Sequence, residues 1–272
     1  MYLHHFGLQT LPFRRTPDPR FFHRTPMHDE ALERLLFAVE EQDHAVLTGD
    51  IGTGKTVIAR TLIDLLDPTR YSVALIVNPI MTPAQFLRVI AEELEHPCTQ
   101  RSKSDLINHI GDVLVELETL NRYPVVIIDE AHLISSKQVF DEIRLITNLQ
   151  RDDANRISFI FIGQPELLSR LKRKAYTALR QRIGISCELA PLSTEDVRDY
   201  LRHRLVVAGA ASSVFSEDAV ACIRERSRGI PRLINGLAHF ALLTAFSGGH
   251  AIVHAGMVEE AARDFMSLQL AE

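Results

Sequence analysis

Residues 49–56 constrain the fold more than any other stretch, because they read Gly-Asp-Ile-Gly-Thr-Gly-Lys-Thr. This matches the P-loop pattern of a glycine, four variable residues, Gly-Lys, and Ser or Thr. Residues 44–48 form an apolar run that suits a buried strand, and residues 57–66 have apolar side chains at helical spacing. A strand, a glycine-rich turn and a helix in that order are the context that the motif requires, so we interpret the stretch as a phosphate-binding loop.

The residue types in this loop suit a nucleoside triphosphate. Three glycines allow a tight turn whose backbone N–H groups point at phosphate oxygens. Lys55 brings a positive charge to the β- and γ-phosphates, and Thr56 offers a hydroxyl to Mg²⁺. The helix that starts here turns its positive end toward the phosphates. The predicted ATP-binding residues are Gly49, Asp50, Ile51, Gly52, Thr53, Gly54, Lys55, Thr56 and Val57.

Length and composition limit the class of protein to which this chain can belong. A chain of 272 residues, 46% hydrophobic and 24% charged, is long enough for one large globular domain or two smaller ones. The net charge of −5 gives no general case for nucleic-acid binding, so any such site must be a local basic patch. The first residues lack the pattern of a signal peptide, and no apolar stretch has the roughly 20 residues that a membrane span needs. We therefore expect a cytoplasmic protein that reaches the inner membrane only through a partner.

Strands alternate with helices through most of the chain, which predicts an α/β fold with a five-stranded parallel sheet. The expected strands are 44–48, 72–77, 125–128, 157–162 and 183–187, and the expected helices are 28–41, 82–95, 104–120 and 136–150. After residue 190 only helices are expected, at 194–208, 217–226, 230–246 and 257–268. We predict three parts: an extended arm without helix at 1–28, an ATPase core at 29–190 and a helical lid at 191–272.

Residues 125–130 read Val-Val-Ile-Ile-Asp-Glu, an apolar strand that ends in two carboxylates. The carboxyl ends of strands in an open α/β sheet are where ligands bind, so these acids are expected beside the P-loop. Asp129 would hold Mg²⁺, and Glu130 would polarise the attacking water as general base. A pair of solvated acids is the alternative. Residues 129–132 also spell a helicase box, but no further helicase motif follows.

Four more polar residues are candidates for the same chemistry. Gln164 follows the fourth strand, where it would contact the γ-phosphate or the water, or else only end a turn before a proline. Arg180 and Arg182 precede the fifth strand. An arginine at this place can reach the nucleotide of a neighbouring subunit as an arginine finger. The alternative is that the two residues form a basic pair on the surface. Arg232 begins a lid helix, from which a guanidinium would reach the γ-phosphate.

With these residues and others, the chain resembles the AAA+ ATPases of the ExeA/GspA type over nearly its full length. The residues that carry the resemblance are the aromatic and proline-rich arm, the P-loop, Ile127 to Leu133, Gly163 to Leu167, Gln181 to Ile183, His203 to Leu205 with Ala208-Gly209, and Gly229 to Asn235.

The resemblance implies an AAA+ core with a helical lid, assembled into a ring or filament with ATP between subunits. It makes Lys55 and Thr56 Walker A residues, and Asp129 and Glu130 Walker B residues. Gln164 takes the sensor-1 position, where Asn, Ser or Thr is commoner, and Arg232 takes the sensor-2 position. Either arginine before the fifth strand serves as the finger, with Arg182 favoured.

Members of such a family act in two settings. One is a secretion or pilus machine whose assembly the ATPase drives. The other is transposition of the TniB/MuB kind, in which an ATP-dependent filament binds DNA and recruits a transposase. Six basic residues without an acid between residues 169 and 186 are the hint for duplex DNA. A nucleotide switch with little turnover is the third alternative.

Overall fold

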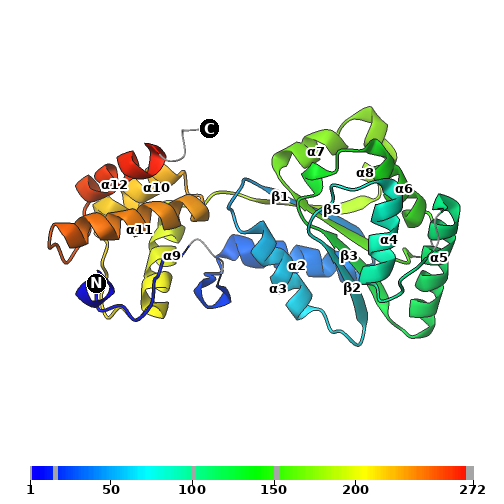
Figure 1. Ribbon diagram of the computed structural model, residues 1–272, viewed down its shortest axis with the longest axis horizontal. Coiled ribbons are helices and arrows are strands. Elements are labelled where there is room, and N and C mark those ends of the chain that lie inside the picture. The colour runs from blue at the N-terminus through cyan, green and yellow to red at the C-terminus, as the bar shows by residue number, and fades with distance from the viewer. Residues whose placement is uncertain (1, 15–17, 100–101, 150–153, 268–272) are drawn as a thin grey trace. The chain divides into compact units, whose positions relative to one another are not determined.

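The computed structural model describes residues 2–14, 18–99, 102–149 and 154–267 (Figure 1). Its contacts divide the chain into two units. The sheet-containing unit comprises Pro26–Gly49 and Gly54–Leu189, and the helical unit comprises Met1–Thr25, Asp50–Thr53 and Ala190–Glu272. The three domains expected at 1–28, 29–190 and 191–272 stay a prediction.

The sheet-containing unit has five strands: β1 (His44–Gly49), β2 (Tyr71–Ile76), β3 (Tyr123–Ile128), β4 (Ser158–Gly163) and β5 (Ile183–Leu189). They lie in the order β2-β3-β4-β1-β5, and every neighbouring pair is parallel. The α/β class and the five-stranded parallel sheet are thereby confirmed.

Helices cover both faces of this sheet, which is why its central strands are continuous apolar runs. In β3, Val126 and Ile128 belong to an apolar cluster with residues of α4 (Pro83–Glu93), α5 (Lys103–Thr119) and α6 (Lys137–Thr147). Their neighbours Val125 and Ile127 point to the opposite face and are equally buried. Helices α2 (Pro26–Glu40) and α3 (Lys55–Leu65) belong to the same unit.

Short helices that the sequence pattern did not predict follow β3 and β4. They are η2 (Ala131–Leu133), α7 (Pro165–Leu171), η3 (Lys174–Tyr176) and α8 (Thr177–Arg180). Each has at most seven residues, too few for a helical period of apolar side chains to be recognised. They matter because candidate residues lie in them or beside them: Gln164 is the N-cap of α7, Arg180 is the last residue of α8, and Arg182 follows two residues later.

The helical unit contains the four helices that were expected after residue 190: α9 (Thr194–Val207), α10 (Glu217–Ser227), α11 (Pro231–Ser247) and α12 (Ala255–Ser267). The expectation of an extended arm without helix is wrong. The arm forms α1 (Tyr2–His5) and a 3-10 turn, η1 (Pro19–Phe21), and the next helix begins at Pro26 rather than residue 28. Residues 15–17 of the arm lie outside the described part.

Buried aromatic side chains hold part of the arm on the helical unit. Phe13 and Phe21 are 3% and 2% exposed. The buried guanidinium of Arg204 in α9 donates through Nε to the carbonyl of Pro12 at 2.7 Å, and it lies 5.1 Å from the centre of the Phe21 ring. Carbonyls and an aromatic face thus stabilise a buried cation, and they fix this part of the arm onto the helical unit.

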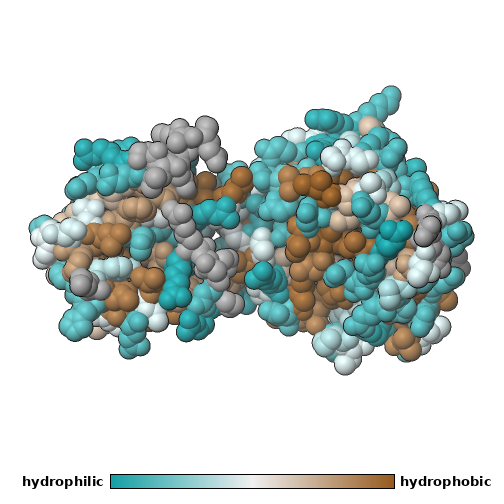
Figure 2. All heavy atoms as spheres, in the orientation of Figure 1, coloured by the Kyte–Doolittle hydropathy of each residue, from teal (hydrophilic) through white to brown (hydrophobic). Residues whose placement is uncertain are grey.

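On the visible face of each unit, hydrophobic residues are interspersed with hydrophilic ones (Figure 2). Within the described part of the chain, no helix combines the length and the apolar character needed to cross a membrane.

Burial of His44 predicts a pH-dependent stability. His44 is fully buried in β1, and its Nδ1 accepts the Phe159 N–H at 3.2 Å. Burial, and secondly the Arg182 guanidinium, lower the pKa of His44 from 6.5 to about 4. Between these two values the unfolded chain binds a proton that the folded chain does not, so stability falls as the pH falls through this window.

Between about pH 6.5 and pH 5, His44 is expected to remove about 2 kcal/mol from the free energy of unfolding. Urea unfolding at about pH 7.5 and pH 5 measures this loss. The His44→Asn variant, which keeps an acceptor near the Nδ1 position, should lose correspondingly less on acidification. The control is His254→Asn, which replaces a histidine whose side chain is 58% exposed, so its pH dependence should match that of wild type. Equal pH dependence in wild type and His44→Asn would contradict the assignment.

Candidate functional site

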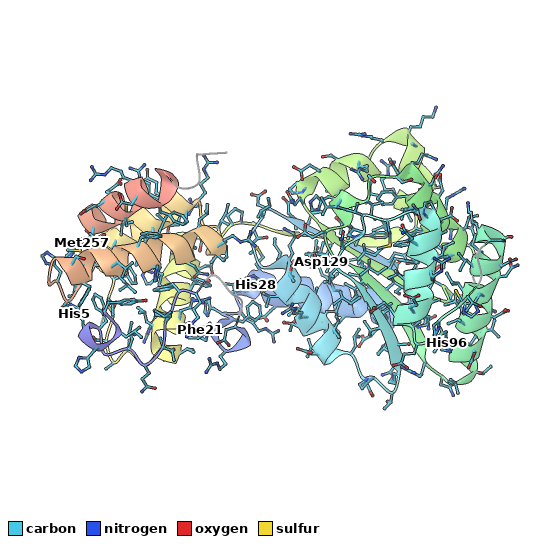
Figure 3. The ribbon with its side chains drawn as sticks, in the orientation of Figure 1. His5, Phe21, His28, His96, Asp129 and Met257 are labelled. Atoms are coloured by element: carbon cyan, nitrogen blue, oxygen red, sulfur yellow. The ribbon has the colours of Figure 1, made fainter. Side chains whose placement is uncertain are left out.

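Three neighbouring strands end at the candidate site. The P-loop follows β1, Asp129 follows β3 (Figure 3), and Gln164 follows β4. The register pairs Thr48 of β1 with Gly163 of β4, and Ile128 of β3 with Phe161 of β4. Because all three strands are parallel, the sheet brings these predicted residues to one edge.

The P-loop has the backbone conformation that its glycines predict. Gly52 and Gly54 have φ angles of 85° and 106°, in the left-handed region that other residues adopt only with strain. Thr53 closes the turn by donating through Oγ1 to the carbonyl of Asp50 at 2.9 Å. Gly54 is also the N-cap of α3.

Helix α3 differs at its start from several other helices of the same unit. Helices α4, α5 and α6 begin with a Thr or Ser side chain that accepts a backbone N–H of the first turn. At α3 the cap is Gly54, with no side-chain hydrogen bond. The first N–H groups of a helix need an acceptor, and a phosphate supplies it at a glycine-capped end. The start of α3 therefore fits a bound phosphate.

The P-loop and the acidic strand end are in direct contact. Thr56 donates through Oγ1 to Oδ2 of Asp129 at 2.9 Å. Lys55 is buried, and its Nζ donates to the carbonyl of Gly49 at 2.7 Å. A hydroxyl next to a carboxylate, both hard oxygen ligands, is a donor set that fits Mg²⁺ carried by a nucleotide. The residues present thus suit a magnesium nucleotide.

Glu130 has a strained backbone. Its φ of 52° places a residue with a side chain in the left-handed region, where such strain costs on the order of 1 kcal/mol or more. The backbone N–H of Glu130 donates to Oδ1 of Asp129 at 2.8 Å, which helps to stabilise this conformation. The Glu130 side chain is 39% exposed, so water reaches its carboxylate.

His132 links Glu130 to Gln164, a contact that the sequence analysis missed. Its Nδ1 lies 3.4 Å from Oε2 of Glu130, and its Nε2 lies 2.8 Å from Nε2 of Gln164. The sequence did place His132 in the motif that follows β3, close to Glu130. That motif gives no information about the contact with Gln164, which is 32 positions away in the chain.

Arg180 and Arg182 lie at the other end of the sheet from the P-loop. Arg182 precedes β5, whose first residue pairs with His44, whereas the P-loop follows the last residue of β1. Six residues of strand separate these ends by roughly 17 Å. The guanidinium of Arg182 donates to the carbonyl of Thr147 and to Asn148, and Arg180 donates to the carbonyl of Lys172. The sheet thus does not bring either arginine to the chain's own P-loop.

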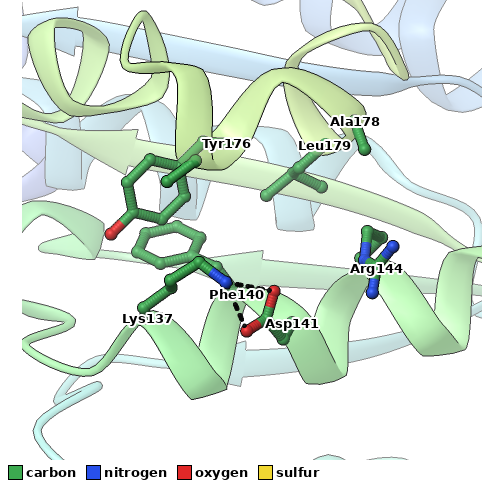
Figure 4. Close-up of a pocket in the computed structure, with 8 residues that line it drawn as sticks. Lys137, Phe140, Asp141, Arg144, Tyr176, Ala178 and Leu179 are labelled. Carbon is green, nitrogen blue, oxygen red and sulfur yellow. Dashed lines mark hydrogen bonds and ion pairs between the residues drawn. The ribbon is translucent and has the colours of Figure 1, made fainter.

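The basic residues between 169 and 186 lie in the short helices α7, η3 and α8 and in the turns next to them. Arg170 is used locally, because it donates to the carbonyl of Ile134, whereas Lys172, Arg173 and Lys174 are exposed. A cavity of about 180 Å³ lies beside this stretch, between α6, η3 and α8 (Figure 4). The rings of Phe140 and Tyr176 meet edge to face there, 5.2 Å apart. None of the predicted nucleotide-binding residues lines this cavity.

Arg232 is described within the helical unit, together with residues 50–53. Its backbone N–H lies 3.4 Å from the carbonyl of Gly52. A Cβ added to Gly52 would lie 2.6 Å from Cβ of Arg232, so only glycine allows this approach. The first turn of α11 therefore contacts the tip of the P-loop, and a role of the Arg232 guanidinium toward phosphate stays a prediction.

A family model described as an AAA domain matches residues 39–171, which contain the P-loop, Asp129, Glu130 and Gln164. The chain belongs to the AAA-type ATPases. Within this class it is 38% identical over 258 residues to General secretion pathway protein A of Aeromonas hydrophila. That match covers 93% of this chain and 47% of the relative, so the chain spans about half of that protein. The resemblance to the ExeA/GspA type is thereby confirmed.

Solved structures share the fold of this chain. Cdc6p of Pyrobaculum aerophilum superposes with a TM-score of 0.67 at 21% identity, covering 92% of this chain and 71% of that one. The Thermotoga maritima RuvB Holliday junction branch migration motor superposes with a TM-score of 0.55 at 18% identity, covering 93% and 73%. These likenesses support the fold, namely a parallel sheet with a helical C-terminal portion.

The contact between Thr56 and Asp129 yields a test of the metal site. Thr56→Val keeps the branched shape and removes the hydroxyl, so Mg²⁺ should no longer strengthen nucleotide binding as it does in wild type. We expect a loss on the order of tenfold in affinity for an ATP analogue with Mg²⁺, and little change without it. Titration calorimetry with and without the metal measures both.

The matched control for this test is Thr61→Val on the same helix. Thr61 donates through Oγ1 to the carbonyl of Val57, a local helical contact away from the strand end. It should bind the magnesium nucleotide like wild type. If Thr56→Val responded to Mg²⁺ as Thr61→Val does, Thr56 would not be a metal ligand.

Proposed function

We propose that this chain binds ATP with Mg²⁺ at the P-loop and hydrolyses it, using Glu130 as general base. The observation that carries the proposal is the 2.9 Å hydrogen bond between Thr56 and Asp129, because it joins the phosphate-binding loop to the acidic strand end. Two motifs 73 residues apart in the sequence thus form one donor set.

Each residue has a defined part in this proposal. The loop and the first turn of α3 bind the phosphates through backbone N–H groups, and Lys55 neutralises the β- and γ-phosphates. Thr56 and Asp129 hold the Mg²⁺, which stabilises negative charge on the phosphate oxygens when bound. Glu130 accepts the proton of the attacking water, and Gln164 positions the γ-phosphate or this water. Arg232 contributes a positive charge from the helical unit.

We also propose that ATP lies between subunits of a ring or filament, with Arg182 or Arg180 acting on the neighbour's nucleotide. Both arginines lie at the opposite end of the sheet from the chain's own P-loop, so an action on phosphate requires a second copy. The relationship to General secretion pathway protein A supports a role in assembling a secretion or pilus machine. In that role the chain works in the cytoplasm and meets the inner membrane through a partner.

A second candidate is an ATP-dependent regulator of transposition that binds duplex DNA and recruits a transposase. The observation in its favour is the exposed basic group at Lys172, Arg173 and Lys174. Sizing the protein with a slow ATP analogue, with and without duplex DNA at two salt concentrations, separates the candidates. A salt-sensitive assembly on DNA supports transposition, and an assembly indifferent to DNA supports the secretion role.

Two substitutions test hydrolysis. Lys55→Ala should lose nucleotide binding, because it removes the charge that neutralises the phosphates. Glu130→Gln should bind ATP as wild type does, but its turnover should fall by about a hundredfold or more, because the amide cannot accept the proton. ATP affinity and phosphate release measure the two effects. Normal turnover by Glu130→Gln would refute the general base, and absent turnover in wild type would favour a nucleotide switch.

A mixing experiment tests the arginine finger. Arg182→Ala should hydrolyse ATP slowly while its monomer binds ATP normally. Mixed with Glu130→Gln, it should regain activity, since the intact Arg182 of the second variant then serves the intact Glu130 of the first. Arg180→Ala tested in the same way decides between the two arginines. If mixing restored nothing for either variant, neither arginine would act between subunits.

A further inference from the structure

His132 lies between two groups with opposite hydrogen-bond demands. Its Nδ1 is 3.4 Å from a carboxylate oxygen of Glu130, which can only accept a hydrogen bond. The same Nδ1 is 3.4 Å from the backbone nitrogen of Gln164, which donates a hydrogen bond. A neutral imidazole carries a single ring proton, so Nδ1 satisfies only one of these neighbours at a time.

The other ring nitrogen faces the side chain of Gln164. Nε2 of His132 is 2.8 Å from Nε2 of Gln164, so in this arrangement the amide donates and the ring nitrogen accepts. The ring proton is then on Nδ1, which lies 3.4 Å from Oε2 of Glu130. This tautomer therefore accepts from the Gln164 amide and turns its proton toward the Glu130 carboxylate.

The backbone makes this arrangement close and specific. A Cβ added to Gly163 would lie 3.1 Å from the backbone N of His132 and 3.4 Å from its Nδ1, so the glycine lets the end of β4 approach the ring. The His132 side chain is 11% exposed, which restricts its movement. The 3-10 helix η2 begins at Ala131, directly after the strained Glu130, and places the ring over the end of β4.

We propose that His132 is a positioning residue that transmits the state of Gln164 to Glu130, a proposal that rests on the ATPase function argued above. A γ-phosphate has only acceptor oxygens, so Gln164 must turn its NH₂ group toward the phosphate to bind it. Its carbonyl oxygen then faces Nε2 of His132. That oxygen accepts a hydrogen bond, so the ring must carry its proton on Nε2 to donate to it.

The switch of tautomer releases the general base. One proton leaves Nδ1 to water and one reaches Nε2 from water, so the ring stays neutral and the proton balance is kept. Nδ1 then accepts the backbone N–H of Gln164 and no longer donates to Glu130. The Glu130 carboxylate loses its imidazole partner and becomes available to the attacking water. Without a γ-phosphate, the imidazole holds the carboxylate and restrains it from acting as a base.

Nuclear magnetic resonance of histidine labelled with ¹⁵N tests the tautomer directly and needs no turnover. The spectra are recorded on the free protein, with Mg²⁺ and a non-hydrolysable ATP analogue, and with Mg²⁺ and ADP. The His132 signal, identified by its loss in His132→Gln, should show the proton on Nδ1 in the free and ADP states and on Nε2 with the analogue. In Gln164→Leu the analogue should bind without changing the tautomer.

A pair of substitutions at His132 gives a kinetic test. His132→Asn places an N–H near the Nδ1 position and lacks the reach to Gln164, so it should hold Glu130 permanently and lower turnover about tenfold or more. His132→Gln keeps a partner for Gln164 and no donor beside Glu130, so its turnover should stay within about threefold of wild type. Both should keep wild-type affinity for the ATP analogue. A purely structural role would instead lower both variants alike.

The outcomes separate this proposal from the proposed function. Binding and hydrolysis of ATP with one unchanged His132 tautomer in all three states would overturn the relay and leave the ATPase proposal standing. Equal turnover of His132→Asn and wild type would likewise overturn the relay. Absence of nucleotide binding in wild type would overturn both.

Discussion

The parallel pairing of β3, β4 and β1 is the constraint on which the candidate site depends. Parallel strands end at the same edge of a sheet, so three separate segments of the chain deliver their polar residues to one place. The sheet can be parallel because helices cover both of its faces, and that burial requires the long apolar runs seen in β1, β3 and β4. The apolar strands that form the core are therefore the same strands that position the candidate site residues.

Unusual backbone conformations shape the candidate site at this edge of the sheet. The glycines at 52 and 54 allow left-handed turns, and the glycine cap of α3 leaves helix N–H groups for a phosphate. Glu130 adopts the same left-handed region at an energetic cost, in the position proposed for the general base. The close approach of β4 to η2 depends on the missing Cβ of Gly163. The site thus combines glycines, which tolerate left-handed conformations and close contacts, with Glu130, which adopts a left-handed conformation under strain.

Much of this arrangement was predictable from local patterns. The glycine spacing of the P-loop predicted its turn, and apolar runs predicted all five strands within a few residues. The pairing of Thr56 with Asp129 followed from the rule that ligands bind at strand ends. The arm was predicted wrongly, because its helical turns have only four and three residues, too few to show a period. The short helices after β3 and β4 lacked the length to show a period at all.

The sequence by itself determined the class of the protein, because a P-loop, an acidic strand end and alternating strands and helices are local patterns with a strong physical meaning. Tertiary structure decided which residues meet. It placed His132 between Glu130 and Gln164, and it placed Arg182 at the opposite end of the sheet from the P-loop. These relationships depend on strand order and register, which are set by packing between distant segments. No pattern along the chain encodes such contacts one by one.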